Sequence, residues 1–170
     1  FVYNYLNLRN ISVLYVNNDF GLDQANVFES EFKKLGGNVL SKDAFEQGAS
    51  DFKTELAKIK TLNPQGIFVP GYTELAIILK QARELGMKQQ FFASVPFENP
   101  DIIKAAGNAA EGVIYSHHFD PDSNAPLVVE YQRKYVAKYG RKSEGFAALA
   151  YDGIRIIAEV LKRCTDNAPC

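Results

Sequence analysis

The chain contains no tryptophan, one methionine and only two cysteines, and neither sign of charge is in excess. Its net charge is −1, and its 19 lysine and arginine residues are scattered, which argues against nucleic acid or an anionic membrane as a partner. No uninterrupted apolar run is long enough to cross a bilayer, so we predict no membrane-spanning helix. Two cysteines without well-placed histidines make a poor zinc site, and we predict no metal.

Both cysteines lie at the end of the sequence, as Cys164 and Cys170 in RCTDNAPC. The intervening Asp, Asn and Pro favour a tight turn, which predicts a small disulfide loop in an oxidising compartment. The alternative is two unrelated thiols, or a boundary that happens to end on cysteine. A basic-then-apolar leader and an initiator methionine are absent, so we expect a mature or excised piece of a longer product.

The motifs of several enzyme classes are also absent. The first predicted strand is followed by NNDFGLDQA, which is neither a dinucleotide fingerprint nor a P-loop, and GxSxG occurs nowhere. His117 and His118 are neighbours in a predicted strand, so their side chains point to opposite faces and do not chelate one ion easily. We therefore predict a protein that is not an enzyme and has no cofactor.

Strand-like and helix-like segments alternate along the 170 residues. We predict strands over 11–16, 38–45, 66–70, 90–95 and 112–119. We predict helices over 25–35, 52–62, 75–85, 100–106, 125–139 and 146–163, and the tail of a helix over 1–10. This alternation is typical of a three-layer α/β/α fold with a five-stranded, mostly parallel sheet, for which we expect the strand order 2-1-3-4-5.

Residues 66–86, GIFVPGYTELAIILKQARELG, show this plan most clearly. A short apolar run leads through a turn into a helical stripe, and Gly86 follows the last apolar residue, where a left-handed helix end favours glycine. Ser50 and Asn99 are predicted helix N-caps. The two helices after the last strand carry more apolar surface than one such sheet usually covers, so we expect a further partner for Leu127, Tyr131, Val136, Ile154, Ile157 and Leu161.

The carboxyl edge of a parallel sheet is where ligands bind in open α/β folds. Phe20, Tyr72 and the loop 94–98 are predicted to lie there, which suits a small ligand with one apolar and one charged end. An aromatic face can lie over an ammonium group, and Glu98 could pair with it directly. The alternative is that Phe20 and Tyr72 only plug the top of the sheet and that Glu98 is a solvated helix-start residue.

Several segments resemble one family: NNDFG, GASDFKTELAKIKTLNPQGIFVPGY, AIILKQARELG, NPDIIKAAGNAAEGV and FAALAYDGIRIIAEVLK. In order and spacing they are similar to type I periplasmic binding proteins, above all the leucine/isoleucine/valine receptors of ABC transporters. The resemblance implies two lobes that close on a ligand, of which this chain is a fragment. Residues 1–115 would be lobe two, and residues 116–170 would be a crossover strand and two helices that pack with the missing lobe one.

The resemblance also implies site residues. Phe20 and Tyr72 match cleft aromatics of the family, and Phe146 matches an aromatic near the hinge. The acidic residue that holds the ligand's ammonium falls at Val95, which is apolar here. Either Glu98 substitutes for it or the ligand lacks a typical amino group.

We therefore expect an extracytoplasmic or periplasmic solute-binding protein for branched-chain or related amino acids, or small carboxylates, whose partner is the membrane permease of an ABC transporter. The alternative is a ligand-sensing domain of a receptor or regulator with the same fold, and an enzyme of the flavodoxin-like class would require a bound cofactor. The unpartnered C-terminal helices would be exposed, folded back onto lobe two, or swapped with a second copy in a homodimer.

Overall fold

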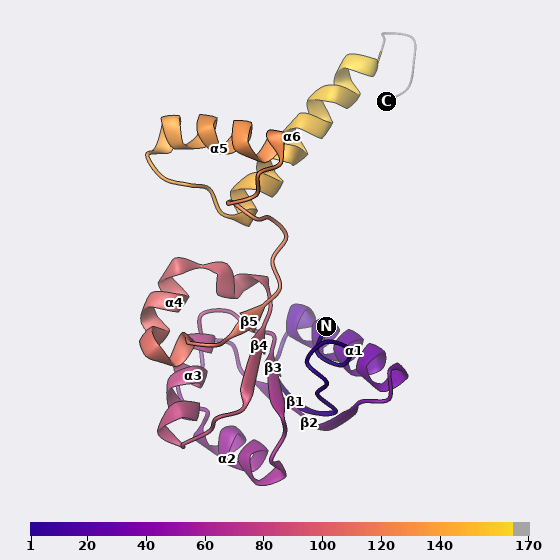
Figure 1. Cartoon of the computed structure of the whole chain (residues 1–170), viewed down its shortest axis with the longest axis vertical. Helices are drawn as coiled ribbons and strands as arrows, with labels where there is room; N and C mark the ends of the chain where they lie inside the picture. Colours follow the sequence, from indigo (N-terminus) through magenta and orange to yellow (C-terminus); the bar gives the residue numbers. More distant parts are fainter. Residues whose placement is uncertain (165–170) are drawn as a thin grey trace. The chain divides into compact units, whose positions relative to one another are not determined.

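The computed structural model describes residues 1–164. It contains a five-stranded parallel sheet with helices in a separate layer on each face (Figure 1). The strands are β1 Asn10–Val16, β2 Asn38–Phe45, β3 Gly66–Val69, β4 Gln90–Ala93 and β5 Ile114–Tyr115. The α-helices are α1 Asp19–Lys34, α2 Lys53–Leu62, α3 Leu75–Glu84, α4 Pro100–Ala106, α5 Pro126–Tyr139 and α6 Gly145–Arg163. The short 3-10 helices are η1 Val95–Glu98 and η2 Gly107–Ala110. Cys170 lies outside the described residues, and so does its predicted bond to Cys164.

The strand order is β2-β1-β3-β4-β5, and every neighbouring pair is parallel. In the central strands Ile11 pairs with Gly66, and Ile67 pairs with Phe91. The predicted fold class and strand order are confirmed. Because all the strands run the same way, their carboxyl ends share one edge.

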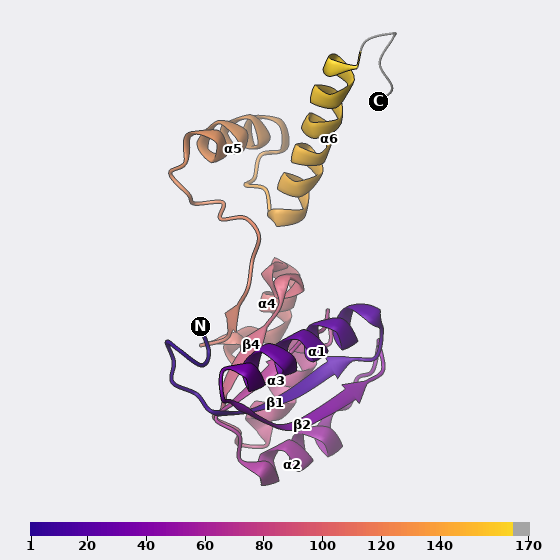
Figure 2. The same cartoon turned by 90° about the vertical axis from the view of Figure 1, so that its right-hand side faces the viewer.

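Helices cover the sheet on both faces (Figure 2). The larger core cluster lies between the sheet and α2, α3 and α4, and includes Leu56, Ile67 and Phe91. On the opposite face, Ile11, Phe32 and Phe92 form a second cluster beneath α1 and the N-terminal segment. Successive side chains of β4 therefore enter different clusters, as a strand buried on both faces requires.

Most helix ends follow from local residues. Asn99 caps α4 by accepting a hydrogen bond from the Asp101 N–H, and Gly86 after α3 has a φ of 72°, both as predicted. The prediction for Ser50 is wrong, because α2 begins at Lys53 and its N-cap position is Phe52. The Ser50 carbonyl instead accepts a hydrogen bond from the Gln81 side chain, so a contact distant in sequence replaces the local cap.

Several predicted segments differ in length or type. Strand β5 is limited to Ile114–Tyr115, because its neighbour β4 ends at Ala93 and offers only one further acceptor, to the Ser116 N–H. The crossover strand expected at the start of residues 116–170 is not formed, since residues 116–120 have no strand conformation. Residues 1–9 form turns instead of a helix tail, and Arg9 lies over the ring of Tyr3 at 3.7 Å from its centroid.

The chain divides into two compact units, 1–116 and 117 onward, which are described separately. In the second unit, Gln132 and Ser143 are buried and hydrogen-bonded to each other at 3.0 and 3.1 Å, which fastens α5 to the start of α6. Tyr131 packs on Tyr151 with ring centroids 4.9 Å apart, and burial raises the pKa of its hydroxyl. No helix within residues 1–164 is both long and apolar enough to cross a membrane.

The apolar surface expected to lack a partner is largely exposed in this second unit. Tyr131 is half-buried, whereas the other five residues of the predicted set are more than a third exposed, with Leu127 at 70% and Ile154 at 67%. The exposed large apolar side chains of α5 and α6 are Leu127, Val129, Val136, Tyr139, Phe146, Leu149, Tyr151, Ile154, Ile156, Ile157, Val160 and Leu161.

Candidate functional site

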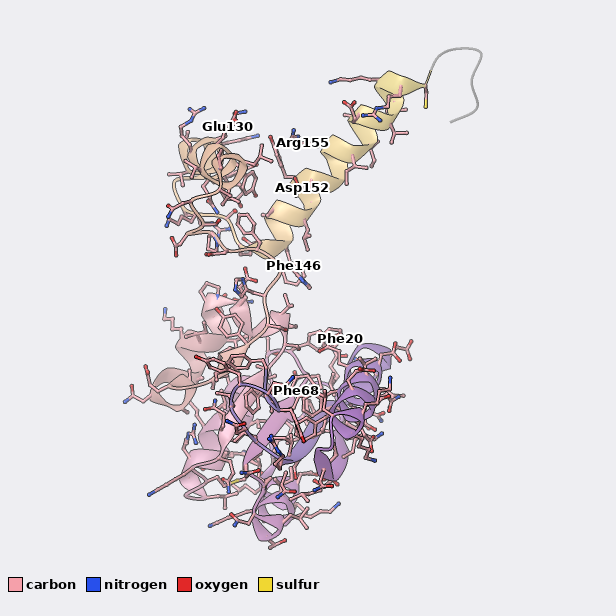
Figure 3. The ribbon with its side chains drawn as sticks, turned by 45° about the vertical axis from the view of Figure 1, so that its right-hand side comes forward. Phe20, Phe68, Glu130, Phe146, Asp152 and Arg155 are labelled. Atoms are coloured by element: carbon pink, nitrogen blue, oxygen red, sulfur yellow. The ribbon has the colours of Figure 1, made fainter. Side chains whose placement is uncertain are left out.

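Three connections follow the central strands at the carboxyl edge of the sheet. Residues 17–20 follow β1, residues 70–74 follow β3, and residues 94–98 follow β4. They carry Phe20 and Tyr72 and the predicted loop that ends in Glu98. Figure 3 labels Phe20 near the start of α1.

Phe20 and Tyr72 are in direct contact. Their ring centroids lie 5.0 Å apart and their planes are inclined by 22°, which is a stacked pair. Both side chains are half-buried and pack against the larger core cluster. The structure thus brings together two candidates that are distant in sequence, whereas their role in binding remains a prediction.

The position of Phe20 depends on a tight passage from β1 into α1. A Cβ on Gly21 would lie 2.1 Å from the Val16 carbonyl oxygen, so only glycine allows the helix to begin this close to the strand. The Asn18 side chain accepts a hydrogen bond from the Gly21 N–H at 3.0 Å and caps the helix. Phe20, the second residue of α1, is therefore fixed by the backbone on either side of it.

Sequence reasoning missed two polar side chains, Glu74 and Gln81, that hold the loop between β2 and α2. Glu74 is 4% exposed, and its Oε1 accepts a hydrogen bond from the Gly48 N–H at 2.7 Å. Gln81 accepts from the Phe52 N–H at 2.7 Å and donates to the Ser50 carbonyl at 3.1 Å. No local signal marks either residue, because a polar side chain just before a helix, as Glu74 is, or on an amphipathic helix, as Gln81 is, is ordinarily solvated.

The strand predicted to continue to Val95 ends at Ala93, and the connection after it forms η1. Val95 and Glu98 are the first and last residues of η1 and both are half-buried. Phe97 between them is buried and packs edge-on against Tyr115, with ring centroids 5.5 Å apart. This aromatic contact anchors the segment to the sheet.

The remaining candidates lie in the second unit. Phe146 is on α6 and is 59% exposed, so its proximity to Phe20 and Tyr72 stays a prediction. The His117 ring bonds to the Phe119 carbonyl at 3.0 Å. Among residues 1–164, no group of three or more His, Cys, Asp or Glu side chains is arranged to hold a metal ion.

Residues 4–169 match the family described as periplasmic binding protein. The chain belongs to this family. It is 30% identical over 124 residues to the Leu/Ile/Val/Thr-binding protein of Salmonella typhimurium, covering 71% of this chain and 34% of that protein. It is 27% identical over 164 residues to the Leu/Ile/Val-binding protein of Escherichia coli, covering 94% of this chain and 44% of that protein.

Solved structures of the family are similar over nearly the whole chain. A leucine binding protein from Thermotoga maritima gives a TM-score of 0.90 at 30% identity, covering 96% of this chain and 47% of that protein. A branched-chain amino acid transporter substrate binding protein from Streptococcus pneumoniae, in complex with isoleucine, gives 0.84 at 26% identity, covering 93% of this chain and 46% of that protein. This periplasmic binding protein chain therefore spans less than half the length of these relatives.

The stacked pair can be tested by a double-mutant cycle of Phe20→Ala and Tyr72→Ala in this chain. Offset aromatic pairs contribute about 0.5–1.5 kcal/mol beyond buried area, so we expect a coupling energy of about that size in urea unfolding. As a control, Phe20→Ala combined with Tyr5→Ala should show no coupling, because Tyr5 stacks on Phe1. Additive effects of Phe20→Ala and Tyr72→Ala would contradict the observed stack.

Proposed function

We propose that this chain is part of an extracytoplasmic solute-binding protein of an ABC transporter, and that it binds branched-chain or related amino acids. The observation that carries the proposal is the stacked Phe20–Tyr72 pair at the carboxyl edge of the parallel sheet. Relatives named for binding leucine, isoleucine and valine support this class of ligand. Their names describe binding proteins, which supports a function without catalysis.

The proposed ligand contacts are divided between its two ends. The half-buried rings of Phe20 and Tyr72 would form an apolar wall that shields the ligand from water, and a ring face also attracts an ammonium group. Val95 would add an apolar contact, and Glu98 would pair with the ammonium group. Phe146 would reach the ligand from near the hinge.

The proposed mechanism is closure of two lobes around the ligand. A ligand shifts a conformational equilibrium only by its differential affinity for the two states, so contacts from both lobes must be made in the closed form alone. The closed shape would then be recognised by the membrane permease. No described feature favours the alternative role as a sensing domain over this one.

We further propose that residues 1–115 form lobe two and that residues 116–170 connect it to lobe one and pack there. The division of contacts after Ser116 supports this boundary. The apolar face of α5 and α6 supports the packing, since exposed apolar surface of this extent marks an interaction site. The covering lobe would be supplied by the part of the relatives that this chain does not span.

The main test uses the two-lobed protein, meaning the proposed longer protein that contains this chain together with lobe one. It is calorimetric titration of that protein with L-leucine, L-isoleucine and L-valine. Tyr72→Ala should weaken binding at least about tenfold, because it removes half of the aromatic wall. Tyr5→Ala is the matched control, since Tyr5 is 74% exposed in the N-terminal segment and should leave affinity unchanged. Unchanged affinity in Tyr72→Ala would exclude Tyr72 as a contact.

A second experiment tests Glu98 as the ammonium partner. The two-lobed protein should bind L-leucine at least about tenfold more tightly than 4-methyl-2-oxopentanoate, the analogue with a carbonyl in place of the amino group. Glu98→Gln should reduce this preference by weakening the binding of leucine alone. A preference for the oxo acid would show instead that the ligand lacks an amino group.

The lobe assignment predicts a contrast between two forms of the protein. In the isolated chain, Ile154→Asp together with Ile157→Asp should leave the melting temperature of residues 1–116 unchanged. Both isoleucines lie on α6, outside that unit, and their side chains are exposed. In the two-lobed protein the same changes should lower the melting temperature markedly, since they would place charges in a buried interface. If the isolated chain forms a dimer in light scattering that these changes abolish, the helices are swapped between copies instead.

A further inference from the structure

The loop of residues 46–52 lies between the two connections that carry Phe20 and Tyr72. On one side, Asn17 donates to the Glu46 side chain at 2.7 Å, and Asn18 donates to the Gln47 side chain at 3.1 Å. Both asparagines belong to the connection that leads into α1. The loop is thus hydrogen-bonded directly to the segment that positions Phe20.

On the other side, the same loop is held by Glu74, two residues after Tyr72. Glu74 is 4% exposed, and its Oε1 accepts the Gly48 N–H at 2.7 Å. A buried polar group is costly unless it is hydrogen-bonded, so this contact is expensive to lose. Glu74 therefore links the connection that carries Tyr72 to the shared loop.

The end of the loop is held by packing, since Phe52 is fully buried and Ala49 lies against the larger core cluster. Glu46, Gln47 and Gly48 are exposed, and Gly48 has a φ of 83°, with no atom within 4 Å of the place where a Cβ would be. Gly48 therefore has no side-chain packing of its own. The packing of Ala49 and the hydrogen bond from the Gly48 N–H to Glu74 restrain the backbone there.

We propose that Glu74 is a positioning residue for the stacked rings of Phe20 and Tyr72. Through its hydrogen bond to Gly48 it keeps the ring of Tyr72 against the ring of Phe20. The inference rests on the proposed function, in which the stacked rings contact the ligand. When only a fraction of molecules has the binding-competent arrangement, the apparent affinity falls by that fraction. Loss of the Glu74 contact should therefore weaken binding although Glu74 itself does not touch the ligand.

The test compares variants that keep or lose the acceptor for the Gly48 N–H. Glu74→Met keeps the length without an acceptor, and Glu74→Asp keeps the charge but is too short to reach. Both should weaken L-leucine binding by the two-lobed protein about fivefold to tenfold, in keeping with the loss of one hydrogen bond. Glu74→Gln retains an acceptor and should stay within about twofold of the unaltered protein.

Gln81→Met is the matched control, because Gln81 also holds this loop, at Ser50 and Phe52. It should lower the melting temperature and leave leucine affinity within about twofold. If Gln81→Met weakens binding as much as Glu74→Met does, the effect is general loosening of the loop, and the specific role of Glu74 is wrong.

A ligand-free measurement separates this inference from the proposed function. In NMR spectra of the present chain, nuclear Overhauser contacts between the rings of Phe20 and Tyr72 should weaken in Glu74→Met and Glu74→Asp and persist in Glu74→Gln and Gln81→Met. Persistence of the contacts in all four variants would overturn the positioning role. The two proposals can therefore fail separately. If the contacts are lost in Glu74→Met and Glu74→Asp alone, the positioning role is supported. If the unaltered two-lobed protein binds neither leucine, isoleucine nor valine, the proposed function is rejected.

Discussion

The site depends on the parallel pairing of β1, β3 and β4. These strands run in one direction and are buried on both faces, so their carboxyl ends meet at one edge. A slip of one residue would move Ile67 and Val69 from the larger core cluster to the opposite face, which specifies the register strongly. The contact between Phe20 and Tyr72 follows from this strand pairing, since each residue lies within four residues of the end of the preceding strand.

The core and the edge are held by different forces. Apolar burial fixes the sheet and the helices, whereas the connections at the edge are joined by polar side chains just before α3 and α1. Such contacts are few and directional, so they can set one arrangement without a large buried area. This matters for a binding site, because the loops must keep the rings in place while their outer surfaces remain available to a ligand.

In the second unit, too, polar contacts join segments of the chain, but little apolar surface is buried. Gln132 and Ser143 fasten α5 to the start of α6, yet most large apolar side chains of α6 remain exposed. An amphipathic helix gains most of its stability in a protein by burying its apolar face. The exposed face of α6 therefore fits a chain that spans less than half the length of its relatives.

The sequence by itself determined the alternation of strands and helices, the order of the strands, and the ends of helices at Gly86 and Asn99. The alternation and the helix ends depend on hydrophobic periodicity and on the conformational preferences of single residues, which act locally. The strand order follows from the general rules by which parallel strands are connected. Only the tertiary structure decided the burial of Glu74, the contacts of Gln81 and the shortening of β5. The partners of Glu74 and Gln81 lie 26 and 29 residues away in the chain, and β5 ends where β4 no longer offers hydrogen-bond acceptors, so no local pattern could encode them.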